Sequence, residues 1–373
     1  MRSRAAFVLA ALSLTAAFAA DPPADPGHLE VPDDPPAEAK LGALPTDAPA
    51  TVVLGNFVSV QVNVDPAGMN RVGDAANEPS LAVDPTDSSR LVIGWRQFDS
   101  IASNFRQAGM AYSHDGGATW TFPGVLEPGQ FRSDPVLAAD SGGRFFYYSL
   151  SEVTQAEMFY SDDGGVTWVG PISAQGGDKT WIAADATGSV GDGQVYMIWN
   201  SQFTCCGQNT DFTRTTDGGQ TYDGPFSMPR KAKWGTVDVG PDGEVHVVGT
   251  RTTFNAFPQE HLLMISSNAR DALSSPTFEQ TTGIELGGPS GVNGTPNPGG
   301  LLGQVWVAID RSTGPTAGNV YVLGSVNPPG ADPLDVMFVR SVDGGATFSA
   351  PRRVHGEEPG AWQWFGTMSV APD

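Results

Sequence analysis

The sequence contains little positive charge, almost no cysteine and, beyond its first 20 residues, no long apolar run. Of its 373 residues, 20 are Lys or Arg and 41 are Asp or Glu, which gives a formal net charge of −21. A chain this acidic repels nucleic-acid phosphates and anionic membranes, so neither is expected as a partner. An anionic ligand would need a local basic pocket.

The one long apolar run lies at the N-terminus, in MRSRAAFVLAALSLTAAFAA. Arg2 and Arg4 precede it, and the small residues around Ala19 end it, an order typical of a secretory signal peptide over residues 1–20. The run is short for a membrane span. We therefore expect a protein that is secreted, periplasmic or held at the cell surface, with no membrane insertion after cleavage.

Only two cysteines are present, Cys205 and Cys206, and they are adjacent. Neighbouring Cα atoms lie about 3.8 Å apart, below the usual disulfide range. The pair therefore forms a vicinal disulfide, bonds to another chain or stays reduced. No second ligand cluster follows at zinc spacing, and no acidic loop is dense enough for calcium. We expect no metal and no cofactor.

Helix signals are nearly absent, because Gly and Pro interrupt every stretch long enough to form a helix. The chain has 46 Gly and 30 Pro with 40% apolar residues, which indicates many strands and turns. Residues 21–50, rich in Pro, Asp and Ala, predict a disordered linker. In FVSVQVNV, at 57–64, Val alternates with polar residues, which predicts a half-buried strand.

Two motifs alternate along the rest of the chain. The first is a pair of apolar segments joined by a turn, such as EPSLAVDPTDSSRLVIGW at 78–95. It returns at 134–150, 179–199, 234–250 and 304–325, and begins again at 365–373. The second is a short box, SHDGGATW at 113–120, with copies at 161–168, 215–222 and 341–348 and a decayed copy at 266–278.

One copy of each motif makes a repeating unit with four strands. Regular repetition of such units predicts an all-β fold, a β-propeller in which every unit is one blade. Residues 51–373 would hold five complete blades of a six-bladed propeller, the sixth having only its first strand. We expect the strand at 57–64 to be the outer strand of that last blade. The propeller is then truncated at its C-terminus, or it leaves an open edge.

The box Ser-x-Asp-x-Gly-x-Thr-Trp resembles the Asp-box, or bacterial neuraminidase repeat, of the sialidase-like propeller superfamily. The resemblance covers about residues 75–373 and implies a box at the turn between the third and fourth strands of each blade. It also implies an exported glycoside hydrolase that acts on anionic glycans. The family's Phe-Arg-Ile-Pro motif has no counterpart before Ser113, since the nearest string, FRSDP, follows the first box.

The box is expected to stabilise the frame. Asp115 can accept hydrogen bonds from backbone N–H groups of its own turn, and the Gly-Gly pair after it permits positive φ. A catalytic aspartate has no reason to recur in every blade. The box residues given this structural role are Asp115, Trp120, Asp163, Trp168, Asp217, Tyr222, Asp343 and Phe348.

A ligand is expected on the face opposite the boxes, by analogy with other propellers. Six residues before each paired-strand turn, one residue per blade would lie at the mouth of the central channel: Glu78, Asp134, Lys179, Trp234, Gln304 and Phe365. Glu78 and Asp134 are predicted as a carboxylate pair for general acid/base catalysis. The residues predicted to bind substrate are Arg96, Arg106, Arg132, Lys179, Trp181, Trp234 and Arg251.

These residue types fit a glycan or glycoprotein, because arginines bind carboxylates in bidentate fashion and indole rings stack on sugar faces. If these residues had only a structural role, the same charges would pair with each other and the tryptophans would pack between blades. Two other functions remain open, a non-catalytic glycan- or protein-binding propeller and a structural module of a longer surface protein. The sequence leaves the substrate and the oligomeric state open.

Overall fold

The computed structural model describes residues 50–371, except 153, 201–203, 208–209, 233, 252–259, 291–303 and 357–359. The predicted signal peptide and nearly all of the predicted linker therefore lie outside the described residues. All regular structure in the described part is β-strand, and no helix there is long and apolar enough to cross a membrane. Five four-stranded antiparallel sheets follow a two-stranded hairpin.

Each four-stranded sheet is one blade, and its strands follow each other in chain order. Blade 1 contains β3 (Ala75–Val83), β4 (Leu91–Phe98), β5 (Gln107–Ser113) and β6 (Thr121–Leu126). Blade 2 contains β7 (Ser133–Ala139), β8 (Phe145–Leu150), β9 (Ala156–Ser161) and β10 (Val169–Ser173). Blade 3 contains β11 (Trp181–Ala184), β12 (Val195–Ile198), β13 (Phe212–Thr215) and β14 (Asp223–Phe226).

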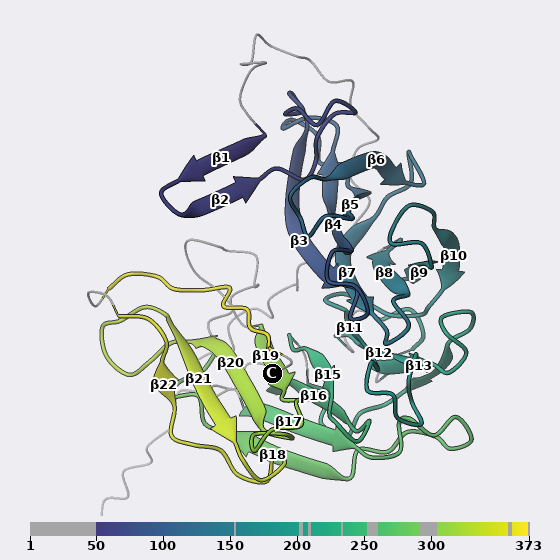
Figure 1. Ribbon diagram of the computed structural model, residues 1–373. Helices are drawn as coiled ribbons and strands as arrows, with labels where there is room; N and C mark the ends of the chain where they lie inside the picture. The colour runs from purple at the N-terminus through teal and green to yellow at the C-terminus, as the bar shows by residue number, and fades with distance from the viewer. Residues whose placement is uncertain are drawn as a thin grey trace, which may run out of the picture.

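Blade 4 contains β15 (Val237–Val239), β16 (Val245–Arg251), β17 (Glu260–Ser266) and β18 (Gln280–Ile284). Blade 5 contains β19 (Val305–Ile309), β20 (Val320–Val326), β21 (Asp335–Ser341) and β22 (Arg352–Arg353). Figure 1 shows the blades arranged in an arc, with the first strand of each blade innermost. Successive innermost strands contact each other from β3 through β7, β11 and β15 to β19. The predicted propeller with five complete blades is confirmed.

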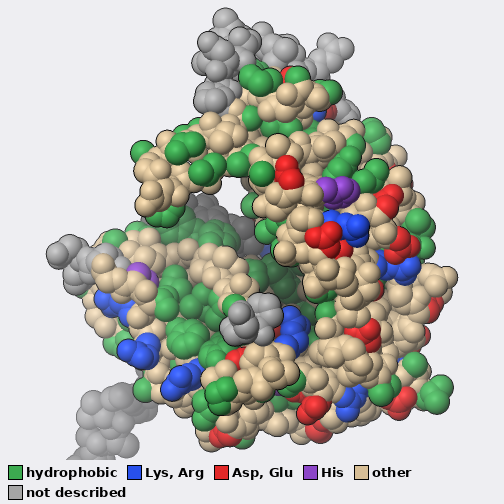
Figure 2. All heavy atoms as spheres, viewed as in Figure 1, with side chains coloured by type: hydrophobic (Ala, Val, Ile, Leu, Met, Phe, Trp, Pro, Cys, Tyr) green, Lys and Arg blue, Asp and Glu red, His purple; other side chains and the backbone are tan. Residues whose placement is uncertain are grey.

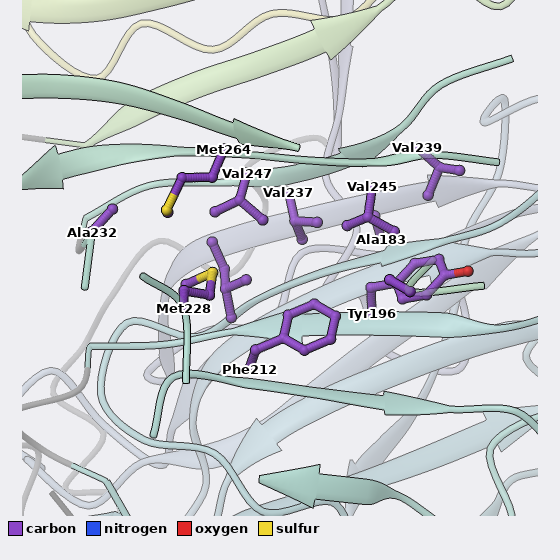
Figure 3. Packing of buried hydrophobic residues seen from close by; sticks show 12 residues of the cluster. Ala183, Tyr196, Phe212, Met228, Ala232, Val237, Val239, Val245, Val247 and Met264 are labelled. Carbon is purple, nitrogen blue, oxygen red and sulfur yellow. The ribbon is translucent and has the colours of Figure 1, made fainter. Parts of the chain in front are cut away.

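The cores lie between neighbouring blades, because each sheet presents an apolar face to the next. Between blades 3 and 4, Phe212 and Tyr196 pack with Val237 and Val247, all buried (Figure 3). Equivalent clusters join blades 1 and 2, blades 2 and 3, and blades 4 and 5. Each large apolar side chain buried in this way contributes about 1.5–3 kcal/mol. These interfaces hold the first strands of the blades side by side around one axis.

The strand predicted at 57–64 does not complete the last blade, so that expectation is wrong. β2 (Phe57–Val60) pairs with β1 (Thr51–Leu54) in a hairpin, and Phe57 and Val58 are exposed. The connecting turn contains Gly55 with φ of 62°. A short turn closes this pairing at little entropic cost, whereas pairing with the far end of the chain closes a very long loop.

The segment that begins the sixth repeat lies against blade 5 without forming a sheet strand in the described residues. The Gln363 N–H donates to the Leu334 carbonyl at 3.1 Å. A Cβ added to Gly366 would lie 2.8 Å from Val336 and 2.9 Å from Leu323, so the backbone packs closely on this blade. This is the place that the first strand of a following blade would occupy.

Candidate functional site

Each intact box forms the turn between the third and fourth strands, and its polar side chains bind the turn together. Asp115 Oδ1 accepts hydrogen bonds from the Ser113 hydroxyl at 2.8 Å and the Thr119 N–H at 2.9 Å, and Oδ2 accepts from the Thr119 hydroxyl at 2.6 Å. Equivalent bonds form at Asp163, Asp217 and Asp343. The Thr119 and Ser113 hydrogen bonds lower the pKa of Asp115 to about 2. Its carboxylate is thus engaged within its own turn.

The decayed box keeps the same design with different residues. Asn268 Oδ1 accepts hydrogen bonds from the Ser266 hydroxyl at 3.1 Å and from the Thr277 N–H at 2.8 Å. A longer loop separates Asn268 from Thr277 than separates Asp115 from Thr119. An amide oxygen therefore replaces the carboxylate as the acceptor in blade 4.

The predicted mouth positions share one unusual backbone conformation. Glu78, Asp134, Lys179, Trp234 and Phe365 all have φ between 48° and 57°, while the sixth position, Gln304, directly follows residues outside the described part. A left-handed conformation costs a non-glycine residue about 1–2 kcal/mol. In β3 and β7 the strand register shifts around this position, and such bulges re-aim side chains. The repeat therefore places one side chain per blade in an equivalent position.

Charged side chains of alternating sign lie at or beside the mouth positions of blades 1 to 3. Arg96 donates to Glu78 at 2.5 Å. Lys179 Nζ lies 3.7 Å from Asp134 Oδ2 and 3.3 Å from Asp178 Oδ1. We call Glu78, Arg96, Asp134, Lys179 and Asp178 the charged arc. Each of its two cations has a carboxylate neighbour, as expected if these charged side chains have a structural role and pair with each other.

Asp134 lies at the centre of the charged arc and is buried. Burial opposes its ionisation, but the charges of Lys179 and Arg96 together hold the pKa of Asp134 below its ordinary value. The Lys179 N–H also donates to Asp134 Oδ2 at 3.3 Å. Asp134 is therefore a carboxylate at neutral pH, suited to the role of base, nucleophile or hydrogen-bond acceptor.

The other predicted substrate-binding arginines lie outside this arc. Arg132 is 3% exposed, forms ion pairs with Glu127 and Glu157, and lies over the Phe159 ring. Arg106 lies over the Phe131 ring, 5.8 Å from its centroid. Arg251 ends β16 in blade 4. Arg132 is thus buried among its partners and does not present its guanidinium to a ligand.

The predicted residue Trp181 packs against a second tryptophan, Trp306, just inside the mouth. Trp181 and Trp306 each lie two residues beyond a mouth position, and their ring centroids are 4.6 Å apart in an edge-to-face arrangement. Both rings are half-buried. The carbonyl of Trp234, also half-buried, accepts a hydrogen bond from the Val305 N–H at 2.8 Å. These indoles pack as part of the frame and keep part of their surface exposed.

Cys205 and Cys206 form a vicinal disulfide. The Cys205 N–H donates to the Gly176 carbonyl at 3.0 Å, and Thr204 forms a bridge with Gly177. The disulfide turn therefore holds the loop that carries Lys179. No cluster of His, Cys, Asp and Glu that could hold a metal ion occurs among the described residues.

Sequence reasoning did not predict Asp178 and Asp211, two of the buried carboxylates in the described residues. Asp178 belongs to the charged arc, and its only signal in the sequence is that it adjoins Lys179. Asp211 lies in blade 3, where burial raises its pKa to about 7. Nothing in the repeat pattern marks Asp211, because its burial depends on how blade 3 packs.

A family model described as BNR/Asp-box repeat matches residues 111–122 and 159–169. A search of the curated proteins found no match. Among solved structures, a GH74 enzyme from Niastella koreensis is 15% identical with a TM-score of 0.46, covering 74% of this chain and 38% of that one. A leech intramolecular trans-sialidase is 11% identical with a TM-score of 0.46, covering 76% of this chain and 61% of that one.

A PL25 ulvan lyase is 11% identical with a TM-score of 0.46, covering 88% of this chain and 86% of that one.

The chain spans less than two thirds of the length of the GH74 enzyme and of the trans-sialidase. The matched boxes and the four-stranded blades confirm the resemblance to the sialidase-like superfamily at the level of repeat and fold: the chain is a β-propeller that carries BNR/Asp-box repeats.

Proposed function

We propose that this protein is an exported glycan-binding propeller whose ligand lies over the channel mouth, on the face opposite the Asp-boxes. The observation that carries the proposal is the shared left-handed conformation at the mouth positions. Backbone strain of this kind is found where a side chain must be held in a fixed direction. Here it holds chemically different side chains in equivalent places around one axis.

The polar part of the mouth suits sugar hydroxyls. A hydroxyl both donates and accepts hydrogen bonds, and the charged arc alternates carboxylates with cationic donors. Three carboxylates and two cations leave the arc with a net negative charge. A neutral glycan therefore fits better than the anionic glycan implied by the family resemblance.

The apolar part of the mouth suits the C–H face of a sugar ring. Trp234 occupies the mouth position of blade 4, and the Trp181–Trp306 pair lies just inside it. Aromatic rings supply a large, rigid apolar surface with a polar N–H at one edge. A sugar ring placed over these indoles would have its hydroxyls directed toward the charged arc.

Glycan-array screening followed by calorimetry tests this function. The Lys179→Met and Trp234→Leu variants are expected to weaken binding of the selected glycan at least tenfold, a loss of about 1.4 kcal/mol each. Arg144→Met is the matched control, because Arg144 binds the Gly218 carbonyl on the box face. The proposal fails if no glycan binds, or if both mouth variants bind as tightly as the control.

Glycoside hydrolysis is a second candidate function, favoured by one specific contact. Arg96 hydrogen-bonds Glu78, and its positive charge helps to lower the pKa of Asp134, so carboxyl groups from two neighbouring blades lie under the influence of one guanidinium. Glu78 and Asp134 would supply the two carboxyl groups of such a reaction. Asp134, which is ionised at neutral pH, would act as base or nucleophile.

A panel of chromogenic glycosides tests this candidate. The Asp134→Asn and Glu78→Gln variants should each lose about 10²–10⁴-fold in rate, with folding verified by circular dichroism. Turnover that survives both changes would remove the catalytic assignment. Binding without turnover in the wild-type protein would leave the glycan-binding function alone.

A further inference from the structure

The Cys205–Cys206 disulfide does not join distant parts of the chain, which is what most disulfides do. Its two residues are the only cysteines of the sequence, and they are adjacent. A disulfide stabilises a fold mainly by closing a loop of the unfolded chain, and it contributes less as that loop becomes shorter. A bond between neighbours closes almost no loop. Its effect is therefore local, on the turn that contains it.

The disulfide turn lies on the same face of the propeller as the charged arc. It belongs to the connection between β12 and β13, the second and third strands of blade 3. Because the strands of a blade alternate in direction, this connection lies opposite the Asp-boxes. The connection from β10 to β11, which carries Asp178 and Lys179, lies there for the same reason.

Three backbone contacts join the connection that contains the disulfide to residues 176–179, which we call the lysine loop. They pair Cys205 with Gly176, Thr204 with Gly177 and Asn200 with Asp178. The N–H groups of Cys205 and Asn200 each lie 3.0 Å from the carbonyl oxygen that accepts their hydrogen bond. The contacts cover three consecutive residues of the lysine loop and end next to Lys179.

The disulfide turn is anchored on one side and accessible on the other. The hydroxyl of Thr204 accepts a hydrogen bond from the indole N–H of Trp199 at 2.9 Å, and Trp199 is buried in blade 3. Cys205 is half-buried, and Cys206 is exposed. A reductant can therefore reach the disulfide in the folded protein, beside the contacts that order the lysine loop.

The lysine loop determines where the ammonium group of Lys179 lies. The Lys179 N–H donates to Asp134 Oδ2 at 3.3 Å, and Nζ lies 3.7 Å from the same oxygen. Blade 2 holds the loop as well, since the Tyr148 hydroxyl donates to the Gly177 carbonyl at 3.3 Å. Lys and Arg are scarce in this chain, and Figure 2 shows them as small, scattered patches on the face in view. A displacement of this one cation therefore changes the charge of the mouth.

We propose that the vicinal disulfide is a redox-sensitive positioning element for Lys179, so that the affinity of the mouth for a glycan depends on the oxidation state of Cys205 and Cys206. The oxidised turn holds the lysine loop in the binding conformation, and reduction loosens it. The effect on affinity rests on the proposed glycan-binding function. The effect on the lysine loop needs no ligand.

A dithiol is the reductant in this exchange. One of its thiolates attacks the sulfur of Cys206, which breaks the Cys205–Cys206 bond and forms a mixed disulfide. Cys205 leaves as a thiolate and takes up a proton. The second thiol of the dithiol then attacks the mixed disulfide and releases Cys206 as a thiol. Two electrons and two protons have passed to the protein, and the dithiol has become a disulfide.

Hydrogen exchange of the folded protein, before and after reduction with dithiothreitol, tests the positioning role without a ligand. The amides of Lys179 and Asn200 should exchange about tenfold faster in the reduced protein, because local opening becomes easier. The amides of β8, in the middle of blade 2, are the control and should not change. Unchanged exchange in the lysine loop, or loss of protection throughout the protein, would overturn the proposal.

The Cys205→Ser/Cys206→Ser variant is the matched control for the reductant. It should exchange like the reduced wild-type protein. Dithiothreitol should have no effect on it, because the chain has no other cysteine. A variant that exchanges like the oxidised protein would show that the disulfide does not order the lysine loop.

Calorimetry with the glycan selected on the array tests the effect on affinity. Reduction and the double serine variant should each weaken its binding about tenfold. By reciprocity, saturation with the same glycan should lower the midpoint potential of the disulfide by about 30 mV, which equals a tenfold change for two electrons. Equal affinity of the oxidised and reduced proteins would refute the proposal and leave the glycan-binding function in place. If no glycan binds, the glycan-binding function fails and the control of affinity fails with it, while hydrogen exchange still decides whether the disulfide positions Lys179.

Discussion

The indole rings of Trp181 and Trp306 meet edge to face inside the channel, with centroids 4.6 Å apart and planes at 77°. Trp181 belongs to blade 3 and Trp306 to blade 5, so the contact passes over blade 4. β15, the intervening innermost strand, has only three residues. Side chains beside it complete the junction, since the Thr236 hydroxyl accepts from the Val307 N–H at 2.9 Å. The pair thus connects two blades that are not neighbours in the propeller.

This contact predicts a measurable coupling between the two tryptophans. Trp181→Ala and Trp306→Ala should each lower the free energy of unfolding by about 2 kcal/mol, less than a fully buried ring would lose. Their double variant should reveal a coupling of about 1 kcal/mol, typical of an edge-to-face pair. Urea denaturation of all four proteins measures it. A cycle of Trp306 with Trp120, in the box of blade 1, is the control and should show no coupling beyond about 0.5 kcal/mol.

Adjacent aspartates in the second box should differ sharply in their effect on stability. Asp163 accepts three hydrogen bonds within its turn, so Asp163→Ala should cost about 1–3 kcal/mol. Asp162 has a 59% exposed side chain and an ion pair with Arg144, so Asp162→Ala should cost less than about 1 kcal/mol. Equal losses in urea denaturation would contradict the turn-binding role of the box.

The blades were predictable because the hydrogen bonds of the box turn are local. They require the same residue types at the same spacing in each copy, and this repetition is visible in the sequence. The decayed copy weakened that pattern, although Asn268 and Thr277 still make two of the bonds. The strand at 57–64 was assigned to the wrong sheet, because alternation of Val with polar residues predicts a strand without naming its partner. Pairing partners depend on loop-closure entropy and packing, which no short pattern contains.

The equivalence of these positions was predictable for a similar reason, since blades 1 to 4 and the segment after blade 5 each carry a left-handed residue at the same distance from the turn. What each charged side chain contacts was not predictable. Arg132 was assigned to a ligand, yet Glu127 precedes β7 and Glu157 lies in β9, and the fold brings both to it. Such contacts arise from tertiary packing and leave no periodic signal.

The left-handed conformation of Lys179 predicts an inverted preference between glycine and alanine. Lys179→Gly and Lys179→Ala both remove the ammonium group, but only glycine adopts a φ of 57° without strain. The glycine variant should be more stable than the alanine variant by about 1 kcal/mol. Ala183→Gly, in the regular part of β11, is the control and should lower stability by a similar amount. Thermal and urea unfolding measure both, and a less stable glycine variant at 179 would contradict the strain.

The buried carboxyl of Asp211 predicts a decline in stability toward alkaline pH. Its Oδ1 accepts from the Met228 N–H at 2.6 Å, while Oδ2 has no hydrogen-bond partner among the described residues. Burial raises the pKa of Asp211 to about 7, against the weaker opposing effects of this hydrogen bond and of Lys231. The unfolded value is near 3.9, so the folded protein holds this proton more tightly. The stabilisation is present below about pH 4 and is lost as the pH rises through 7.

Asp211→Asn should remove this dependence, because the amide oxygen still accepts from Met228 and never ionises. The variant should be more stable than the wild-type protein at pH 8, by on the order of 2–4 kcal/mol, and the difference should shrink as the pH falls toward 5. The box aspartates with lowered pKa lose their stabilisation only as the pH falls below about 4, through their folded pKa near 2. Burial also lowers the pKa of His246 and of His261 to about 4, so both change stability between about pH 4 and 6.5, but equally in the two proteins. The difference between the two stability curves from pH 5 to 8 therefore isolates Asp211, and parallel curves would show that Asp211 is ionised throughout.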